Sequence, residues 1–200
     1  MKLRINLLLT AALLITSTGV FDVRERTLEI QRYPDEPLQL VELKISGQSV
    51  TDRIVLKSKL PGSEWFTDSV SFNDTEDWYK RVSFRLRNVT DKTIHGVGAD
   101  LFFRPVGERN LYSVQLDAAT DLKKKLVEPG DEVELTLNEL RLQPIMDLMT
   151  KAGVDVNKCE VSFSLDTAVY SEQLRWYRGQ LLHPDPTTPN KWIPVNKPAQ

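Results

Sequence analysis

Apolar and polar residues alternate in several short stretches of the chain. In the clearest example Val41, Leu43 and Ile45 are separated by Glu42 and Lys44. A period of two residues is typical of a strand with one face in a core and the other in solvent. Strands are predicted at 38–45, 53–57, 78–87, 93–104, 111–116, 132–137, 158–170 and 174–182. The pattern therefore predicts a protein built mainly from short β-strands.

The strand at 78–87 has the strongest alternation, with Phe84 on its apolar face. Turn-forming residues follow it, so it is predicted to fold back on residues 93–104 as a hairpin. The register that keeps both faces consistent places Phe84 opposite Val97. We expect Phe84 to be buried against a facing sheet.

One short helix and a proline-rich tail interrupt this pattern. Residues at about 143–152 form an apolar stripe at helical spacing, with Pro144 suited to the first turn and Gly153 to the C-terminal stop. The tail at 184–200 contains five prolines and is expected to lie extended on the surface. Trp192 in the tail is predicted to pack on the sandwich.

The first residues have the pattern of an export signal. Lys2 and Arg4 precede an apolar run at 5–15, and small residues follow at 16–19. The run is too short to span a bilayer core of about 30 Å. Cleavage is expected after Gly19, which predicts a periplasmic or extracellular location with no membrane anchor after signal cleavage.

The predicted organisation has four parts. They are a signal peptide at 1–19, an irregular lead-in at 20–37, a β-sandwich domain at 38–183 and the extended tail at 184–200. Seven to nine antiparallel strands with one crossover helix describe an all-β, immunoglobulin-like β-sandwich.

Three groups of residues support a family resemblance. They are Trp78 at the start of a strand that ends in Arg87-Asn88-Val89-Thr90, Pro129-Gly130-Asp131 before an alternating strand, and Trp176 with Gly179 followed by Asp185-Pro186 and Pro189 to Trp192. In these features the chain resembles small exported bacterial proteins with an uncharacterised immunoglobulin-like domain. The resemblance covers roughly residues 38–193. It implies fold and export only.

Charge and cysteine content exclude some classes of protein. The 200 residues include 26 basic and 28 acidic side chains, and removal of Lys2 and Arg4 makes the chain more acidic. This balance argues against a general binder of nucleic acid or anionic membranes. Cys159 is the only cysteine, so an intrachain disulfide is impossible and the core must supply the stability.

The search for catalytic chemistry is mostly negative. His95 and His183 are the only imidazoles, and neither lies in a recognisable motif. Cys159 alternates with apolar residues and is expected to behave as a buried hydrophobic group. The sequence contains no phosphate-binding glycine loop, no nucleophile elbow and no Cys-x-x-Cys pair. We therefore predict a protein that is not an enzyme, with no catalytic residue, cofactor or metal ligand assigned.

The acidic stretch at 73–77 is the best candidate for a metal site. Asp74, Glu76 and Asp77 offer the carboxylate oxygens that Ca²⁺ prefers. Their spacing matches no known calcium loop, so a solvated turn before Trp78 is the favoured interpretation.

An arginine row is the most suggestive surface feature. Arg81, Arg85 and Arg87 share the polar face of the strand at 78–87. In the predicted hairpin Gly96 and Gly98 face this row, which would leave room for a shallow anion- or sugar-binding groove.

Two aromatic residues complete the candidate ligand-contacting surface, Tyr177 and Trp192. The alternative for the row is a solvated strand face with cross-strand ion pairs, such as Arg81 with Asp100, each worth about 0.2–1 kcal/mol.

These observations predict an exported, non-catalytic β-sandwich module with a binding or structural role. Its ligand is not assigned, and a protein or glycan partner is expected rather than nucleic acid. The alternative is a secreted carbohydrate-binding or calcium-dependent adhesion module, and a hydrolase is third.

Overall fold

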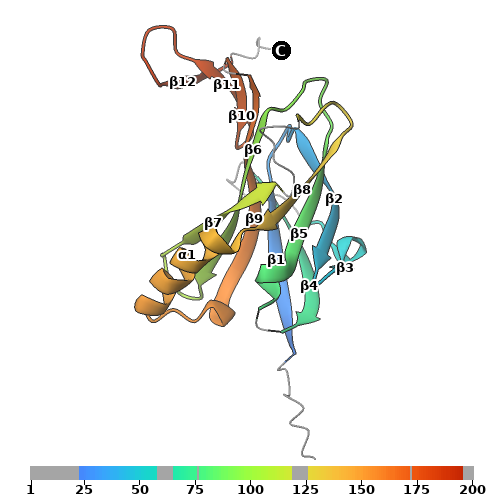
Figure 1. Cartoon of the computed structure of the whole chain (residues 1–200), viewed down its shortest axis with the longest axis vertical. Coiled ribbons are helices and arrows are strands. Elements are labelled where there is room, and N and C mark those ends of the chain that lie inside the picture. Colours follow the sequence, from blue (N-terminus) through green and yellow to red (C-terminus); the bar gives the residue numbers. More distant parts are fainter. Residues whose placement is uncertain (1–22, 58–64, 76, 119–125, 172, 196–200) are drawn as a thin grey trace, which may run out of the picture.

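The computed structural model of the chain describes residues 23–57, 65–75, 77–118, 126–171 and 173–195 (Figure 1). These residues form mostly antiparallel β-structure with one α-helix, so the all-β prediction is confirmed. The strands are β1 (Arg24–Arg32), β2 (Leu38–Ile45), β3 (Gln48–Ser49), β4 (Phe66–Asp74), β5 (Val82–Asn88), β6 (Gly96–Pro105), β7 (Tyr112–Ala118), β8 (Glu132–Leu137), β9 (Cys159–Ser171), β10 (Leu174–Tyr177), β11 (Gln180–Pro184) and β12 (Trp192–Pro194). The helix is α1 (Glu139–Lys151), and three 3₁₀ turns are η1 (Thr51–Arg53), η2 (Trp78–Arg81) and η3 (Val156–Lys158).

The strands form two layers. The β9 layer contains β4, β1, β9, β6 and β7, and β10, β11 and β12 continue it because β10 pairs with the end of β9. The β5 layer contains β8, β5, β2 and β3. β7 joins the layers, because its first half pairs with β6 and its last residues pair with β8. β1 runs parallel to β9, whereas the other pairs are antiparallel.

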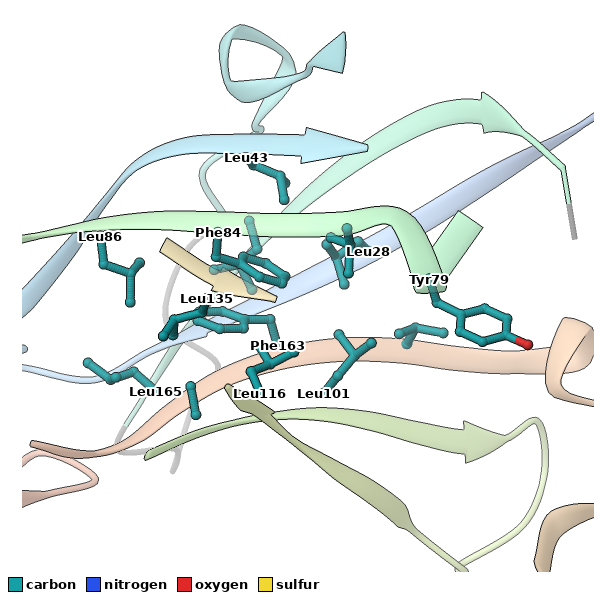
Figure 2. Packing of buried hydrophobic residues seen from close by; sticks show 14 of the residues in the cluster. Leu28, Leu43, Tyr79, Phe84, Leu86, Leu101, Leu116, Leu135, Phe163 and Leu165 are labelled. Carbon is teal, nitrogen blue, oxygen red and sulfur yellow. The ribbon is translucent and has the colours of Figure 1, made fainter. Parts of the chain in front are cut away.

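Aromatic and aliphatic side chains fill the space between the layers. The ring of Phe84 on β5 stacks on the ring of Phe163 on β9, with centroids 4.0 Å apart (Figure 2). Phe84 has no exposed surface, so its predicted burial is confirmed. Leu28, Leu101 and Leu165 complete this part of the core.

Alternation predicted several strands correctly. The predictions at 38–45, 111–116, 132–137 and 158–170 correspond to β2, β7, β8 and β9. The turn at 129–131 is also confirmed, since Gly130 has a φ of +84° and its N–H donates to the carbonyl of Asn88 at 2.9 Å. Each of these strands places its alternating apolar residues in the core, which is the property that alternation reports. β9 also buries Ser164 and Asp166 on its opposite face.

The predicted hairpin between 78–87 and 93–104 is wrong. β5 pairs with β2 and β8, whereas β6 pairs with β7 and β9. The intervening chain crosses from one layer to the other, and the amide of Asn88 fixes this crossing by donating to the carbonyls of Lys92 (2.8 Å) and Val127 (2.9 Å). Facing strands of two layers have the same alternation as neighbours in one sheet, so the pattern alone could not separate the two arrangements.

The predicted irregular lead-in at 20–37 is also wrong, because it contains β1. β1 lies between β4 and β9, and Leu28 and Ile30 are buried in the core. The charged residues of this strand occupy its outer positions and its start. Because only Leu28 and Ile30 are apolar among these charged residues, the alternating pattern of β1 was too short to be recognised in the sequence.

Two further strand predictions fail in part. Residues 53–57 form no strand, and only Val55 makes an isolated bridge, to Ser69. Residues 78–81 form η2 and not part of a strand. Tyr79 is buried there, although in a strand it would share the predicted polar face with Arg81 and Arg85. Its ring packs edge-on against Phe103, 5.5 Å away, which explains the burial.

The helix is confirmed but begins earlier than predicted. Asn138 caps its N-terminus by accepting a hydrogen bond from the N–H of Leu140 at 2.9 Å. Pro144 therefore lies inside the helix rather than in its first turn, while Gly153, with a φ of +72°, ends it as predicted. Among the described residues no helix is long and apolar enough to cross a membrane.

The end of the chain forms three strands rather than one strand and a tail. Residues 174–182 divide into β10 and β11 at a tight turn formed by Arg178 and Gly179, and β12 adds to β11 within the predicted tail. β10, β11 and β12 are here called the C-terminal extension. β10 pairs with the end of β9, and the extension projects beyond the core at the top of Figure 1. The predicted signal peptide at 1–19 lies outside the described residues.

Candidate functional site

The structure separates the five predicted ligand-contacting residues into two groups. Arg81, Arg85 and Arg87 lie on η2 and β5, in the β5 layer. Tyr177 lies on β10 and Trp192 on β12, in the C-terminal extension. They do not form one surface.

Arg81, Arg85 and Arg87, here called the β5 row, each have an acidic partner. Arg81 lies 3.0 Å from Asp74, Arg85 lies 2.6 Å from Glu42, and Arg87 lies 2.6 Å from Glu132. The predicted hairpin paired Arg81 with Asp100. In the structure Arg81 pairs with Asp74 instead.

The pKa values of two of these carboxyls report the pairing. Burial alone would raise the pKa of Asp74, but hydrogen bonds from Ser46 and Thr75 and the charge of Arg81 outweigh burial and lower it. The hydrogen bond from Arg87 lowers the pKa of Glu132. Gly96 and Gly98 lie on β6, away from this row, so the predicted groove between them and the arginines does not form.

Tyr177 and Trp192 share one face of the C-terminal extension. Tyr177 lies opposite Gln180, and Trp192 lies opposite Pro184. Gln180 and Pro184 are an even number of positions apart on β11, so their partners point to the same side. Arg175 lies on this side too, opposite Leu182. Arg175, Tyr177 and Trp192 are called the aromatic–arginine face.

Arg175 has an unusual environment for an arginine. The central carbon of its guanidinium lies 4.1 Å from the centroid of the Trp192 ring. Its Nε is buried and has no hydrogen-bond partner. Across the described ranges, no carboxylate forms an ion pair with Arg175. The ring thus holds a cationic group that has no counter-ion within these ranges.

A second arginine anchors the extension to the β9 layer. Nε and Nη2 of Arg178 donate to the two carboxylate oxygens of Asp166, at 2.9 and 3.0 Å, and the hydroxyl of Ser164 donates to the same carboxylate at 3.0 Å. The guanidinium of Arg178 also lies 5.5 Å from the ring of Tyr177. Asp166 is 7 % exposed, so this bidentate pair adds to the pairing of β10 with β9 and holds the turn between β10 and β11 beside β9.

Two carboxyls near this anchor are shifted towards the protonated form. Burial, together with the hydrogen bond and charge of Asp166, raises the pKa of Asp100 to about 7. Burial raises the pKa of Glu36, in the turn after β1, to about 7. Both groups therefore exchange a proton near neutral pH.

The acidic stretch at 73–77 is engaged by the protein's own cations and hydroxyls. Asp74 accepts hydrogen bonds from Ser46 and Arg81, and Asp77 pairs with Lys80 at 3.2 Å. Within the residues that the structure places, no three histidine, cysteine, aspartate or glutamate side chains gather as a metal site. Glu76 lies outside the described residues.

The environments of Cys159, His95 and His183 show no activated nucleophile or base among them. Burial raises the pKa of the Cys159 thiol to about 11, so the thiol is protonated at neutral pH. His95 is exposed, and Nδ1 of His183 contacts the carbonyl of Pro184 at 2.9 Å.

Sequence reasoning found Tyr177 and Trp192 but missed Arg175 and Asp166. The Arg178-Gly179 pair is a turn signal that could have divided 174–182 into a hairpin and placed Arg175 beside Tyr177. Comparison of the chain with protein-family models, curated proteins and solved structures finds no match.

Proposed function

We propose that this chain is an exported, non-catalytic binding module whose contact surface is the aromatic–arginine face. One observation supports this assignment above the others. Arg175 is held on the ring of Trp192 and has no acidic partner in the described part of the chain. Export is supported by Lys2 and Arg4 before the apolar run at 5–15.

The two arginine groups differ in what a ligand would have to displace. At the β5 row an incoming anion competes with carboxylates already bound at 2.6–3.0 Å. At Arg175 the anion meets a guanidinium with no competing carboxylate in the described part of the chain. The Trp192 ring also restricts the side chain before binding, so less conformational entropy is lost when a ligand orders it.

The immunoglobulin-like classification belongs to this proposal. It is supported by two layers of mainly antiparallel strands, by the core between them and by the crossing of the chain between β5 and β6. A sandwich of this kind offers its end strands and loops as contact surfaces.

Carbohydrate is the ligand class that the face favours. Tyr177 is 41 % exposed, and the amide of Gln180 lies opposite it on the same side. An exposed ring beside amide and guanidinium donors provides both stacking and hydrogen bonds. Calcium-dependent adhesion has less support, since Asp74 and Asp77 already bind Arg81 and Lys80.

A glycan array tests the proposal. The protein lacking residues 1–19 is applied with Arg175→Met and Tyr177→Ala, and Arg85→Met serves as the matched arginine control. Binding to neutral or acidic glycans should fall at least about tenfold in the first two variants, a loss of roughly 1.4 kcal/mol. It should be unchanged in the control. Binding that is lost in Arg85→Met and retained in Arg175→Met contradicts the assignment, and failure of every glycan to bind rejects carbohydrate.

A further inference from the structure

A cavity of about 330 Å³ lies between the first part of β1 and the start of β9. The parallel pairing of these strands covers 28–31 and 161–164 only, so they diverge before it begins. Figure 1 shows this end of β1 at the bottom of the molecule, opposite the C-terminal extension. We call this cavity the β1–β9 notch.

Arg26 lies in the wall of the notch with most of its donors unused. Nη1 donates to the carbonyl of Asn157 at 3.3 Å, whereas Nε and Nη2 are buried and have no hydrogen-bond partner. No carboxylate of the described residues pairs with Arg26. A buried guanidinium with unpaired N–H groups is costly, because water no longer solvates its charge. An acceptor supplied from outside would remove that cost.

The mouth of the notch has the opposite charge. Glu25 and Glu160 line it, are exposed, and form no ion pair with any lysine or arginine that the structure places. Glu29 also lines it and lies 3.8 Å from Lys57. A simple anion such as inorganic phosphate would be repelled by these carboxylates, and a simple cation would be repelled by Arg26.

The remaining wall includes a buried aromatic ring and an uncharged thiol. Trp78 is buried and packs edge-on against Phe72, with ring centroids 4.9 Å apart. Cys159 contributes a protonated thiol, since burial raises its pKa. Charges screened from water by such walls interact more strongly than charges on an open surface. The volume is at the lower end for ligand cavities and suits a molecule of amino-acid or dipeptide size.

We propose that the β1–β9 notch binds a small zwitterion, an α-amino acid or a dipeptide. The ligand carboxylate accepts hydrogen bonds from Arg26 after a rotation of its guanidinium, and the ligand ammonium lies between Glu25 and Glu160. Charges of both signs in the site thus find partners in one molecule. This site is separate from the aromatic–arginine face and does not depend on the function proposed for that face.

Glycylglycine is the probe, with sodium acetate and methylammonium chloride as its single-charge controls. The readout is the ¹⁵N–¹H signal of the Trp78 indole, assigned by comparison with Trp78→Phe. Glycylglycine should shift this signal to saturation, with a Kd of roughly 0.1–10 mM. Acetate and methylammonium should each bind at least about tenfold more weakly.

Variants distinguish a binding role of Arg26 from a structural one. Arg26→Met removes the donors but keeps the side-chain stem, so affinity for glycylglycine should fall at least tenfold while the melting temperature is unchanged or higher. Arg109→Met, an exposed arginine on the loop after β6, is the control and should bind normally. Glu25→Gln with Glu160→Gln should weaken glycylglycine binding and strengthen acetate binding, because the carboxylates that repel the anion are removed. If Arg26→Met does not fold, Arg26→Lys replaces it, and the same tenfold loss is required.

Three results would overturn the proposal. They are no saturable shift with glycylglycine, acetate binding as tightly as glycylglycine, or unchanged affinity in the folded Arg26 variant.

Discussion

The arginines of β5 and those of the C-terminal extension have the same side chain in different surroundings. Arg81, Arg85 and Arg87 each bind a carboxylate from a neighbouring strand or loop. Arg178 binds the buried Asp166, whereas Arg175 lies on the ring of Trp192 and has no acidic partner among the residues that the structure describes. A row of like charges in a sequence is therefore no measure of unpaired charge in the fold. Whether an arginine is paired depends on the residues that lie next to it on neighbouring strands and loops.

The two faces of β5 should differ most in their effect on stability. Phe84→Ala removes a ring that is fully buried against Phe163, so it should lower the free energy of unfolding by about 3–5 kcal/mol. Arg85→Ala removes a half-exposed ion pair and should cost less than about 1 kcal/mol. Denaturant unfolding measures both. Similar small losses would show that β5 is not the core strand of this layer.

The anchor of the extension should have the next largest effect. Arg178→Met leaves the carboxylate of Asp166, which is 7 % exposed, without its main partner. Because Arg178 itself is partly exposed, we expect a loss of about 1–3 kcal/mol. Hydrogen exchange should become faster in β10 and β11 than in β5. Unchanged exchange in β10 and β11 would mean that other contacts hold the extension.

Stability should also depend on pH in a specific direction. The pKa values of Asp100 and Glu36 are raised to about 7 in the folded protein, above the usual carboxyl range. The folded state therefore binds protons more tightly than the unfolded state, and their contribution is complete below about pH 4 and is lost as pH rises through about 7.

Between pH 7.5 and 5 the free energy of unfolding should rise by roughly 1–2 kcal/mol, allowing for partial exposure. Asp100→Asn should reduce this rise, whereas Glu134→Gln, an exposed carboxyl on β8, should not. Below about pH 4 the trend should reverse, because Asp74 has a lowered pKa and loses its pairing when protonated. Thermal melts across this range that show constant stability would contradict the assignment of Asp100 and Glu36.

Removal of residues 189–200 should have the smallest effect on stability. It deletes β12 and the ring under Arg175, and it exposes the edge of β11. The melting temperature should fall by roughly 2–4 °C, and the new edge should favour association in sedimentation experiments. A truncated chain that melts unchanged and stays monomeric would show that β12 contributes neither stability nor edge protection.

The alternation of apolar and polar residues predicted where the strands lie in the sequence better than it predicted which strands pair with each other. β2 and β8 were predictable because each has an apolar face in the core and a more exposed opposite face. β9 was predictable because its apolar residues alternate with polar ones, although its outward-facing Ser164 and Asp166 are also buried. Their arrangement was not predictable, because residues 78–88 and 93–104 have matching faces whether they are adjacent or stacked. The crossing depends on the Asn88 amide and the carbonyls of Lys92 and Val127, and the spacing along the chain does not encode these contacts.

The candidate site was predictable to a similar extent. Tyr177 and Trp192 stood out as large aromatic residues near the end of the chain, and the structure places both on one face. Arg175 gained its significance only from contact with Trp192, which requires the pairing of β10, β11 and β12. β12 was not predicted because the tail is rich in proline, which is excluded from central strands. β12 is an edge strand, and Pro194 is compatible with that position.

Arginine footprinting tests the central claim most directly. The protein is labelled with an arginine-specific dicarbonyl reagent, once free in solution and once in the envelope or secreted fraction of the cells that produce it, and modification is measured by mass spectrometry. If the aromatic–arginine face is the contact surface, labelling of Arg175 should fall at least about threefold in the presence of that fraction, while labelling of Arg85 and Arg87 stays the same. Protection of Arg85 and Arg87 with unchanged labelling of Arg175 would contradict the account.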